Sequence, residues 1–392
     1  MRVAGVGCCV VDLLYEVPPG QDRLTRWLSR SPGDGGVIRG GAVLKSALER
    51  RAGTPIEAWI AEVLGDVVPR RTLGGVSIVA LIAAAQLLPR EVASVRLHAC
   101  LSDDPEGEWI LEQIGRTPVG RDKLRRRPGR CPTTLCLNEG LPDGRRERSF
   151  VAEPGTPAPL ALDPGELDQD FFGSEVAVFC CMHWEPRLFA GLSSVTATCK
   201  RNGAVTVMGL AFDPSRASHP DRWPIGDSDE VYRNVDVLLM DRTEAARYSG
   251  ERELEPALAF FRRSGVGAFV ITDGIEPVLY WSGGSVCAAA EGRLPIPAAI
   301  DQDKARGVLP TGDSVGCGDN LVGGVVASLV MQRHQGRRLD LVEAVRLGNL
   351  SGGIASTHAG GAFFESRPGE RRELVEHYGA LYDAQLRAAR LR

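Results

Sequence analysis

Short apolar runs rich in β-branched residues alternate with amphipathic segments over most of the chain. Strands are predicted in RVAGVGCCVV (2–11), SVRLHACL (94–101), VAVFCCM (176–182), AVTVMGLA (204–211), VDVLLMD (235–241), GAFVITDG (267–274) and VLYWS (278–282). Helical spacing separates them, as in GEWILEQIG (107–115), LFAGLSSVTATCKRNG (188–203), RTEAARYSG (242–250) and ELEPALAFFRRSG (253–265). This alternation predicts an α/β fold, with a mostly parallel sheet covered by helices on both faces. Ligands of such sheets bind beyond the carboxyl ends of the strands.

Two segments break the alternation. Residues Thr133–Gly155 fit two strands that turn near Asp143–Gly144, and Leu24–Val43 is a glycine-rich excursion. We expect both to form a lid over one end of the sheet, with lid elements within 13–45 and 131–152 and an unusual insertion between 20 and 72. Neither segment is long enough to be a domain, so the chain is predicted to form one domain over 1–392.

Composition and charge exclude some partners. The 392 residues are 43% hydrophobic and 24% charged, with a formal net charge of −4, as in soluble globular proteins. The chain has no basic excess of the kind that nucleic-acid-binding proteins display. The basic run Gly120–Arg130 fits a solvated loop better than a polyanion site. The apolar run Gly75–Leu88 is too short to span a membrane, so no membrane partner is predicted.

The ten cysteines fit small core residues better than disulfides. Neighbours such as Cys8–Cys9 and Cys180–Cys181 point to opposite faces of a strand and do not bridge easily. No CxxC spacing indicates zinc. Asp12 interrupts an N-terminal run that superficially imitates a secretory signal. These features predict a cytoplasmic protein with free thiols.

The stretch GVLPTGDSVGCGDNLVGG (307–324) carries the clearest chemistry. Its glycines precede an apolar helix, whose N-terminus offers unpaired backbone N–H groups and the positive end of the helix dipole. Gly316, Cys317 and Gly318 would let that backbone approach an anion closely. Asp319 would lie beside them as a general base. The plainer alternative is that Asp319 caps the helix and the glycines only turn the chain.

The segment DSVGCGDNLVGG resembles the DTxGAGDxFxxG signature of the ribokinase-like (PfkB) carbohydrate kinases. This resemblance implies that Asp319 activates the substrate hydroxyl and that the backbone of 316–318 is the anion hole. Asp313 also matches, whereas Cys317 replaces the usual alanine, Ser314 the threonine and Leu321 the phenylalanine. The implied fold has three α/β/α layers and a small β lid.

Further segments resemble this family in the expected order. They imply that Asp12, at the end of the first strand, binds the sugar, and that Gly74 and Gly75 line the substrate pocket. They also imply a nucleotide-side set, which comprises Asp241, Glu244, Thr272, Gly274 and Asn349, the last where the final helix on the adenine side begins. Apart from the resemblance, each of these residues has a plainer structural interpretation. Asp12 fits a turn at the end of a strand, and Gly74–Gly75 fits the turn that enters a helix. Thr272–Gly274 fits an ordinary turn.

The sequence departs from the family pattern in three places. Val79 stands where the family has a sugar-binding asparagine, and Asp241 replaces the asparagine of NxxE, although Glu244 is kept. The insertion after Asp12 is long and includes Asp34, Gly35 and Gly36. These three are candidates to face the substrate pocket, but a surface turn fits them better.

The resemblance implies transfer of the γ-phosphoryl group of ATP to a hydroxymethyl group of a small sugar or sugar derivative. It implies Mg²⁺, organised through water by Glu244, and a monovalent cation such as K⁺ at Asp313. A homodimer through the lid would follow the family. His183, Trp184 and His358 are assigned to packing.

Three alternatives are open. A nucleoside kinase would stack a base on lid aromatics, and the hairpin offers only Phe150. A non-catalytic sugar-binding sensor on the same scaffold would not need Asp319. A dehydrogenase is disfavoured because GVGCCVVD (5–12) imitates GxGxxG poorly and does not open into a helix.

Overall fold

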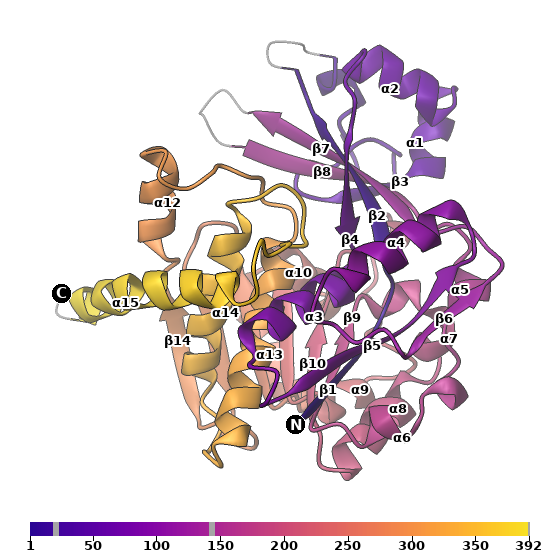
Figure 1. Cartoon of the computed structure of the whole chain (residues 1–392). Helices are drawn as coiled ribbons and strands as arrows, with labels where there is room; N and C mark the ends of the chain where they lie inside the picture. The colour runs from indigo at the N-terminus through magenta and orange to yellow at the C-terminus, as the bar shows by residue number, and fades with distance from the viewer. Residues whose placement is uncertain (19–22, 141–145, 391–392) are drawn as a thin grey trace.

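The computed structural model of the chain describes residues 1–18, 23–140 and 146–390, and shows two β-sheets of different size (Figure 1). The predicted turn at Asp143–Gly144 lies outside the described residues. The larger sheet has nine strands, in the spatial order β14 (Ala290–Leu294), β13 (Val278–Ser282), β12 (Ala268–Thr272), β11 (Val237–Asp241), β10 (Val205–Gly209), β9 (Val176–Cys180), β1 (Arg2–Val6), β5 (Ser94–Ser102) and β6 (Leu124–Arg127). Strands from β6 to β12 are parallel, and β13 and β14 are antiparallel.

Helices cover both faces of this sheet, as the alternation predicts. One face packs against α3 (Val76–Leu87), α4 (Pro105–Gly115), α13 (Cys317–His334) and α14 (Leu341–Ala355), onto which α12 (Ala298–Ala305) and α15 (Glu370–Arg390) pack. The other packs against α5 (Pro157–Leu160), α6 (Gln169–Phe172), α7 (Pro186–Phe189), α8 (Leu192–Arg201), α9 (Glu230–Asn234), α10 (Arg242–Ser249) and α11 (Leu254–Ser264). In β9, Val176 and Val178 face the first group, whereas Ala177 and Phe179 face the second. Strands buried on both faces are apolar throughout for this reason.

The predicted first strand, 2–11, is in fact parts of two strands. β1 ends at Val6, and the chain leaves the larger sheet at Gly7, where a Cβ atom would lie 1.9 Å from Ser77 Oγ. β2 (Val10–Glu16) then enters the smaller sheet. Asp12 therefore lies within a lid strand and does not end the first strand. The apolar sequence is uniform here, so the break depends on the contact with Ser77.

The smaller sheet lies beyond the carboxyl end of β1, from which β2 continues (Figure 1). Its spatial order is β3 (Ala42–Leu44), β8 (Arg146–Glu153), β7 (Thr133–Gly140), β2 and β4 (Arg70–Gly74). Compared with the expected lid ranges, 13–45 and 131–152, it adds β4 and the start of β2. The predicted hairpin is present as antiparallel β7 and β8.

The insertion folds into α1 (Lys45–Ala52) and α2 (Ile56–Leu64), which the sequence interpretation did not include. Their signal is the helical spacing of Leu48, Ile56, Trp59 and Val63, which are buried against Leu135 and other residues of the lid. The insertion thus gives the lid a hydrophobic core of its own. Dimerisation through the lid stays a prediction and would need surfaces other than this covered face.

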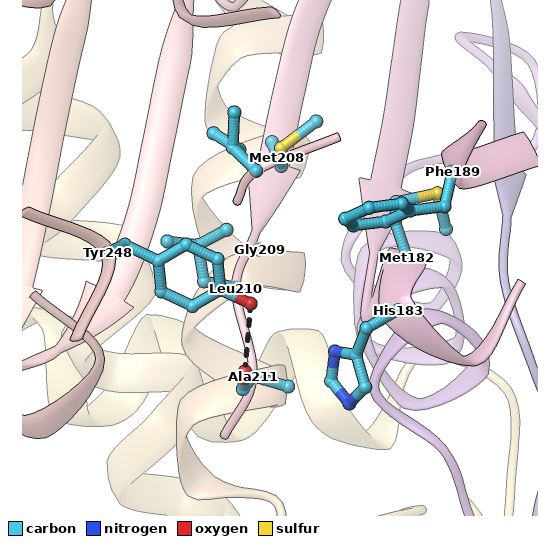
Figure 2. Close-up of a pocket in the computed structure, with 9 residues that line it drawn as sticks. Met182, His183, Phe189, Met208, Gly209, Leu210, Ala211 and Tyr248 are labelled. Atoms are coloured by element: carbon cyan, nitrogen blue, oxygen red, sulfur yellow. Dashed lines mark hydrogen bonds between the residues drawn. The ribbon is translucent and has the colours of Figure 1, made fainter. Parts of the chain in front are cut away.

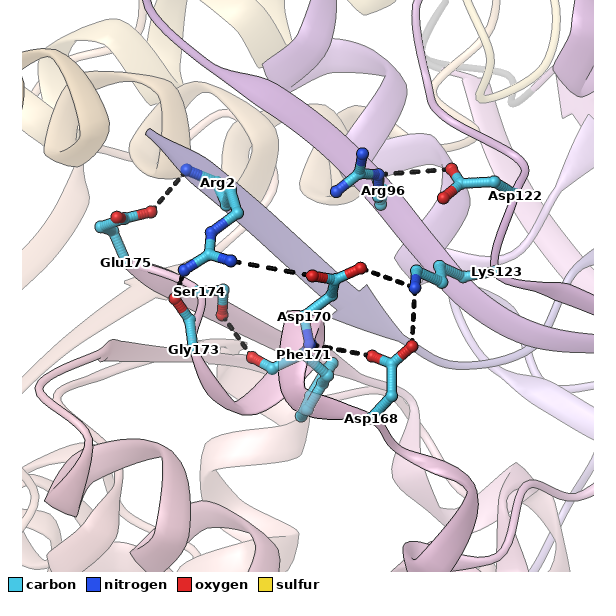
Figure 3. A network of polar contacts seen from close by, with 10 residues as sticks. All are labelled: Arg2, Arg96, Asp122, Lys123, Asp168, Asp170, Phe171, Gly173, Ser174 and Glu175. Carbon is cyan, nitrogen blue, oxygen red and sulfur yellow. Dashed lines mark hydrogen bonds and ion pairs between the residues drawn. The ribbon is translucent and has the colours of Figure 1, made fainter.

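The basic run Gly120–Arg130 includes the edge strand β6, and several of its cations pair within the chain, among them Lys123 (Figure 3). Lys123 Nζ lies 2.6 Å from Asp168 Oδ2 and 2.7 Å from Asp170 Oδ2. Arg126 pairs with Glu108 at 2.6 Å. These acidic partners neutralise the run locally, which argues against a polyanion site, and charged side chains protect an open sheet edge. In the described part of the chain, no helix has the length and apolar character needed to cross a membrane.

Candidate active site

The N-terminus of α13 opens at the glycine motif. Gly316 is the N-cap, with φ of 74°, and a Cβ atom there would lie 2.4 Å from Gly361 Cα. Only glycine accommodates both the positive φ and this contact. At Gly318, by contrast, a Cβ atom would meet no heavy atom within 4 Å. The helix therefore begins at a tightly packed turn and presents its first amides next to open space, as an anion site requires.

Asp319 lies in the first turn of α13 and is half-buried. Burial raises the pKa of its carboxyl to about 6, against the opposing influence of the positive charge of Arg148. A carboxylate with this pKa is ionised at pH 7 and is a stronger base than an exposed aspartate.

Arg148 is a site residue that the sequence interpretation missed. It extends from β8 of the lid, and its Nη1 donates to Ser314 Oγ at 3.0 Å, in the loop before α13. Its guanidinium also lies 5.9 Å from the centroid of the Phe150 ring. The available signal was the two-residue alternation of a strand, which places Arg148 on the same face as Phe150.

The lid also brings Asp12 to the site. Asp12 is buried in β2, and a Cβ atom at Gly74 would lie 1.9 Å from its Oδ2. Burial, with the charges of Asp319 and Asp313, raises the pKa of Asp12 well above its usual range. Carboxyls that are about 300 residues apart in the chain thus face a common space. Gly75 follows as the N-cap of α3.

Asp313 joins three segments. Its Oδ1 accepts the N–H of Val315 at 2.9 Å, its Oδ2 accepts the N–H of Gly360 at 3.0 Å, and Asn138 of β7 donates a further hydrogen bond. The carboxylate therefore fixes the anion-hole loop against the loop after α14 and against the lid. Its monovalent cation stays a prediction.

Asp241 and Glu244 form a reciprocal cap at the start of α10. Glu244 N donates to Asp241 Oδ1, and Asp241 N donates to Glu244 Oε2, each at 2.7 Å. Burial, then the charges of Asp241 and Asp319, raises the pKa of Glu244 well above its usual range. The carboxylate thus lies near the catalytic candidate. Within the described ranges, no group of three or more His, Cys, Asp or Glu side chains is placed to hold a metal ion.

The remaining nucleotide-side residues differ in their surroundings. Thr272 ends β12, and a Cβ atom at Gly274 would meet no heavy atom within 4 Å. Asn349 was expected where the last adenine-side helix begins, and the structure corrects this position. It lies in the middle of α14, followed by α15, and is buried with its Nδ2 donating to Tyr382 Oη at 3.0 Å. Packing of α15 thus engages the amide group.

The candidates Asp34, Gly35 and Gly36 belong to a turn of the insertion. Asp34 Oδ2 accepts the N–H of Arg30 at 2.8 Å and pairs with Arg51 of α1 at 2.8 Å. Its Oδ1 accepts the N–H of Gly36 at 2.9 Å. The structure thus uses this carboxylate to shape the turn against α1, in agreement with the surface-turn alternative.

A second, small cavity lies at the carboxyl ends of β9 and β10 (Figure 2). Met182, Phe189 and Met208 line it, and His183 points toward it. Tyr248 Oη donates to Ala211 O at 3.3 Å across the cavity. Burial lowers the pKa of His183, as for a packed imidazole. Among the described residues that line it, none is acidic, and the cavity lacks the glycine-rich helix start of the α13 site.

Comparison with known proteins agrees with this geometry. The profile of the "pfkB family carbohydrate kinase" matches residues 68–367, and no curated protein matches the chain. An adenosine kinase from Sinorhizobium meliloti is 20% identical with a TM-score of 0.67, covering 95% of this chain and 98% of its own. A ribokinase from Arabidopsis thaliana, solved with ribose and ATP, is 16% identical with a TM-score of 0.62, and a fructokinase with bound ATP from Xylella fastidiosa is 15% identical with a TM-score of 0.62. Each of these two covers 96% of this chain and 98% of its own.

These structural similarities establish a ribokinase-like α/β fold over nearly the whole chain. The family profile covers 300 of the 392 residues, from β4 through the anion-hole motif to the loop before α15. The chain belongs to the pfkB family of carbohydrate kinases, which are phosphotransferases.

Proposed function

We propose that this kinase transfers the γ-phosphoryl group of ATP to a hydroxymethyl group of a small sugar or sugar derivative. The observation that supports this most directly is the convergence of Asp12, Asp319 and the open N-terminus of α13. Asp12 can accept two hydrogen bonds from neighbouring hydroxyls, and Gly74 leaves room beside that carboxylate.

The transfer needs one proton acceptor and a place for negative charge. The substrate hydroxyl oxygen attacks the γ-phosphorus and gives its proton to Asp319, while the bond from phosphorus to the β,γ-bridging oxygen breaks and ADP leaves. The amides of Cys317 and Gly318 face the charge on the transferring group. Arg148, beside Asp319 and Ser314, adds a positive charge on the lid side. Positioning and electrostatic stabilisation supply most of the acceleration in such reactions.

Magnesium fits the acidic cap at the start of α10. Mg²⁺ in kinases takes one or two carboxylates together with substrate phosphates and water. Glu244 is buried and Asp241 is half-buried, and the charges of the two carboxylates disfavour each other, so a nearby cation would stabilise their ionised forms. When bound with ATP, Mg²⁺ neutralises charge on the phosphate oxygens. These two residues would hold it, Glu244 through water.

The side chains of the lid favour a sugar as the acceptor. Phe150 packs near Leu14, Cys136 and Val315, and Arg148 lies over its ring at 5.9 Å. A ring engaged in this way offers a nucleobase less free surface than an unengaged one, which favours sugars over nucleosides. Nucleosides therefore belong in the test as the competing acceptor class.

The test is ADP release with Mg–ATP and a panel of sugars, sugar acids, polyols and nucleosides. We expect acceptor-dependent turnover by wild type and a loss of about 10²- to 10⁴-fold in Asp319→Asn, because the base is removed. Asp66→Asn, which changes an exposed surface carboxylate, is the matched control. Turnover of nucleosides alone would replace the proposed acceptor class. Ligand binding without any turnover would indicate a non-catalytic sensor, and activity retained in Asp319→Asn would mean that another group is the base.

A further inference from the structure

A buried cation lies behind the anion hole. Arg371, in the first turn of α15, has 0% of its surface exposed. Its Nη2 donates to Asn320 Oδ1 at 2.6 Å and to Ser351 Oγ at 2.9 Å, and its Nη1 donates to Gln86 Oε1 at 3.2 Å. Burial lowers the pKa of Arg371 to about 10, so the side chain stays charged at neutral pH. These side-chain partners are neutral, while the nearby carboxylate of Glu365 partly offsets the positive charge of the guanidinium.

Asn320 connects this cation to the catalytic motif. It follows Asp319 in α13, and only 1% of its surface is exposed. Its Nδ2 donates to Gly316 O at 2.8 Å and to Gly361 O at 2.8 Å. Because Arg371 can only donate, its contact fixes which end of the Asn320 amide is the oxygen. The same contact polarises the amide and strengthens both bonds from Nδ2.

The two carbonyls held by Asn320 lie at a close backbone contact in the site. Gly316 and Gly361 approach so closely that a Cβ atom on Gly316 would lie 2.4 Å from Gly361 Cα. In a planar trans peptide, C=O and N–H point in opposite directions. Holding Gly316 O toward Asn320 therefore directs the N–H of Cys317 the opposite way, out of the helix and toward the transferring group.

We propose that Asn320, locked by Arg371, is a positioning residue for phosphoryl transfer. It sets the orientation of the anion-hole amides by holding the carbonyls of Gly316 and Gly361. This inference rests on the proposed function for its kinetic consequence, but the arrangement of the loop can be tested without any substrate. Neither residue touches the reacting atoms in this role.

Asn320→Asp is the decisive substitution. It keeps the size of the side chain and its contact with Arg371, now as an ion pair, but it replaces the side-chain donor to both carbonyls by an acceptor. Gly316 O keeps its bond from the backbone N–H of Asn320, at 2.9 Å, whereas Gly361 O loses its bond from Asn320. We expect kcat to fall about 10- to 100-fold, with the KM of the acceptor changed less than threefold, because the amides are misdirected while the acceptor site is intact. The thermal midpoint should stay near that of wild type. Asn320→Ala removes the donors without adding charge and should lower kcat in the same range.

Gln332→Glu is the matched control. Gln332 is a fully buried amide on the same helix, and it donates to Ser328 Oγ at 3.0 Å and to Asp340 O at 3.1 Å. It lies twelve residues beyond Asn320, about 18 Å along the helix. Its replacement should lower the thermal midpoint, because it buries an acceptor in place of a donor, and should leave kcat within about twofold. If Asn320 only stabilised the fold, Asn320→Asp would behave like Gln332→Glu, with a lower thermal midpoint and a kcat close to that of wild type.

Amide hydrogen exchange of the unliganded proteins supplies the second readout. Asn320→Asp and Asn320→Ala should each speed exchange across residues 313–321 and near Gly361, while Gln332→Glu should not. Wild-type kcat in either Asn320 variant, or unchanged exchange in that segment, would overturn the proposal. If wild type phosphorylates no acceptor, the proposed function fails, whereas the exchange data still decide whether Asn320 orders the loop.

Discussion

The raised pKa of Asp319 predicts that this candidate catalytic carboxylate destabilises the folded protein. Replacing it by the uncharged amide in Asp319→Asn should remove activity and raise stability at the same time. Burial moves the pKa from 3.8 in an exposed carboxyl to about 6. At about 1.36 kcal/mol per pKa unit this corresponds to about 3 kcal/mol, and partial exposure of the side chain reduces it to about 2–3 kcal/mol.

The sign follows from proton linkage. Between pH 4 and 6 the folded protein retains a proton that the unfolded chain has released, so wild-type stability falls as pH rises through this interval and is then constant. The full gain of Asp319→Asn is therefore expected at pH 8, and about half of it at pH 5. The charge of Asp319 also raises the pKa of Asp12, so its removal adds a gain of the same sign.

Calorimetry of both proteins at pH 5 and pH 8 measures this difference. With about 2.1 cal/mol/K of unfolding entropy per residue, a chain of 392 residues gains about 3 °C in Tm at pH 8. The exposed control Asp66→Asn should change stability by less than about 0.5 kcal/mol. A Tm of Asp319→Asn equal to or below that of wild type at pH 8, or an equal gain at both pH values, would show that ionisation of the buried Asp319 does not destabilise the folded protein.

Three further predictions concern the lid and the base. The pH profile of kcat/KM should rise with an apparent pKa of about 6 as Asp319 ionises. In Arg148→Gln this rise should move to higher pH, because a positive charge that favours the carboxylate is lost. A rise at the same pH would show that Arg148 does not influence the ionisation of Asp319. Gly74→Ala should raise the acceptor KM about 10- to 100-fold in steady-state kinetics. The new Cβ atom would lie 1.9 Å from Asp12 Oδ2 and would displace this hydrogen-bonding carboxyl group. An unchanged KM would show that Asp12 does not bind the acceptor. Trp59 is fully buried in the lid core, so Trp59→Ala should lower the free energy of unfolding by about 3–5 kcal/mol and speed amide exchange in β2 and β7. Unchanged exchange in these strands would show that the insertion does not support the lid.

Most strands of the larger sheet and the candidate catalytic motif were predictable from the sequence, whereas the edge strands β6 and β14 were not predicted. Strands such as β5, β9 and β12 begin and end within one or two residues of their apolar runs. Hydrophobic periodicity is a local property, so it identifies such elements without knowledge of their partners. The glycines at 316 and 318 and Asp319 were likewise readable, because a helix N-terminus and its first turn lie within a few consecutive residues.

The sequence was less informative where one pattern fits two structures. The apolar run 2–11 predicts one strand, and its division at Gly7 depends on Ser77, seventy residues away. Asn349 lies in a segment whose role at a helix start was inferred from similarity, and its burial depends on Tyr382 of α15. In the insertion, the glycine-rich stretch drew the interpretation toward a flap, although the apolar spacing after residue 45 marks two helices.

Only the tertiary structure decided which polar groups meet. Arg148 reaches Ser314 across 166 positions of the chain, and Arg371 reaches Asn320 across 51. A polar side chain in a sequence carries no signal of its partner, because its hydrogen bonds are satisfied by whichever face of another element packs against it. Close packing of the lid, α13 and α15 brings these groups within hydrogen-bonding distance, and burial then makes each of those contacts costly to lose.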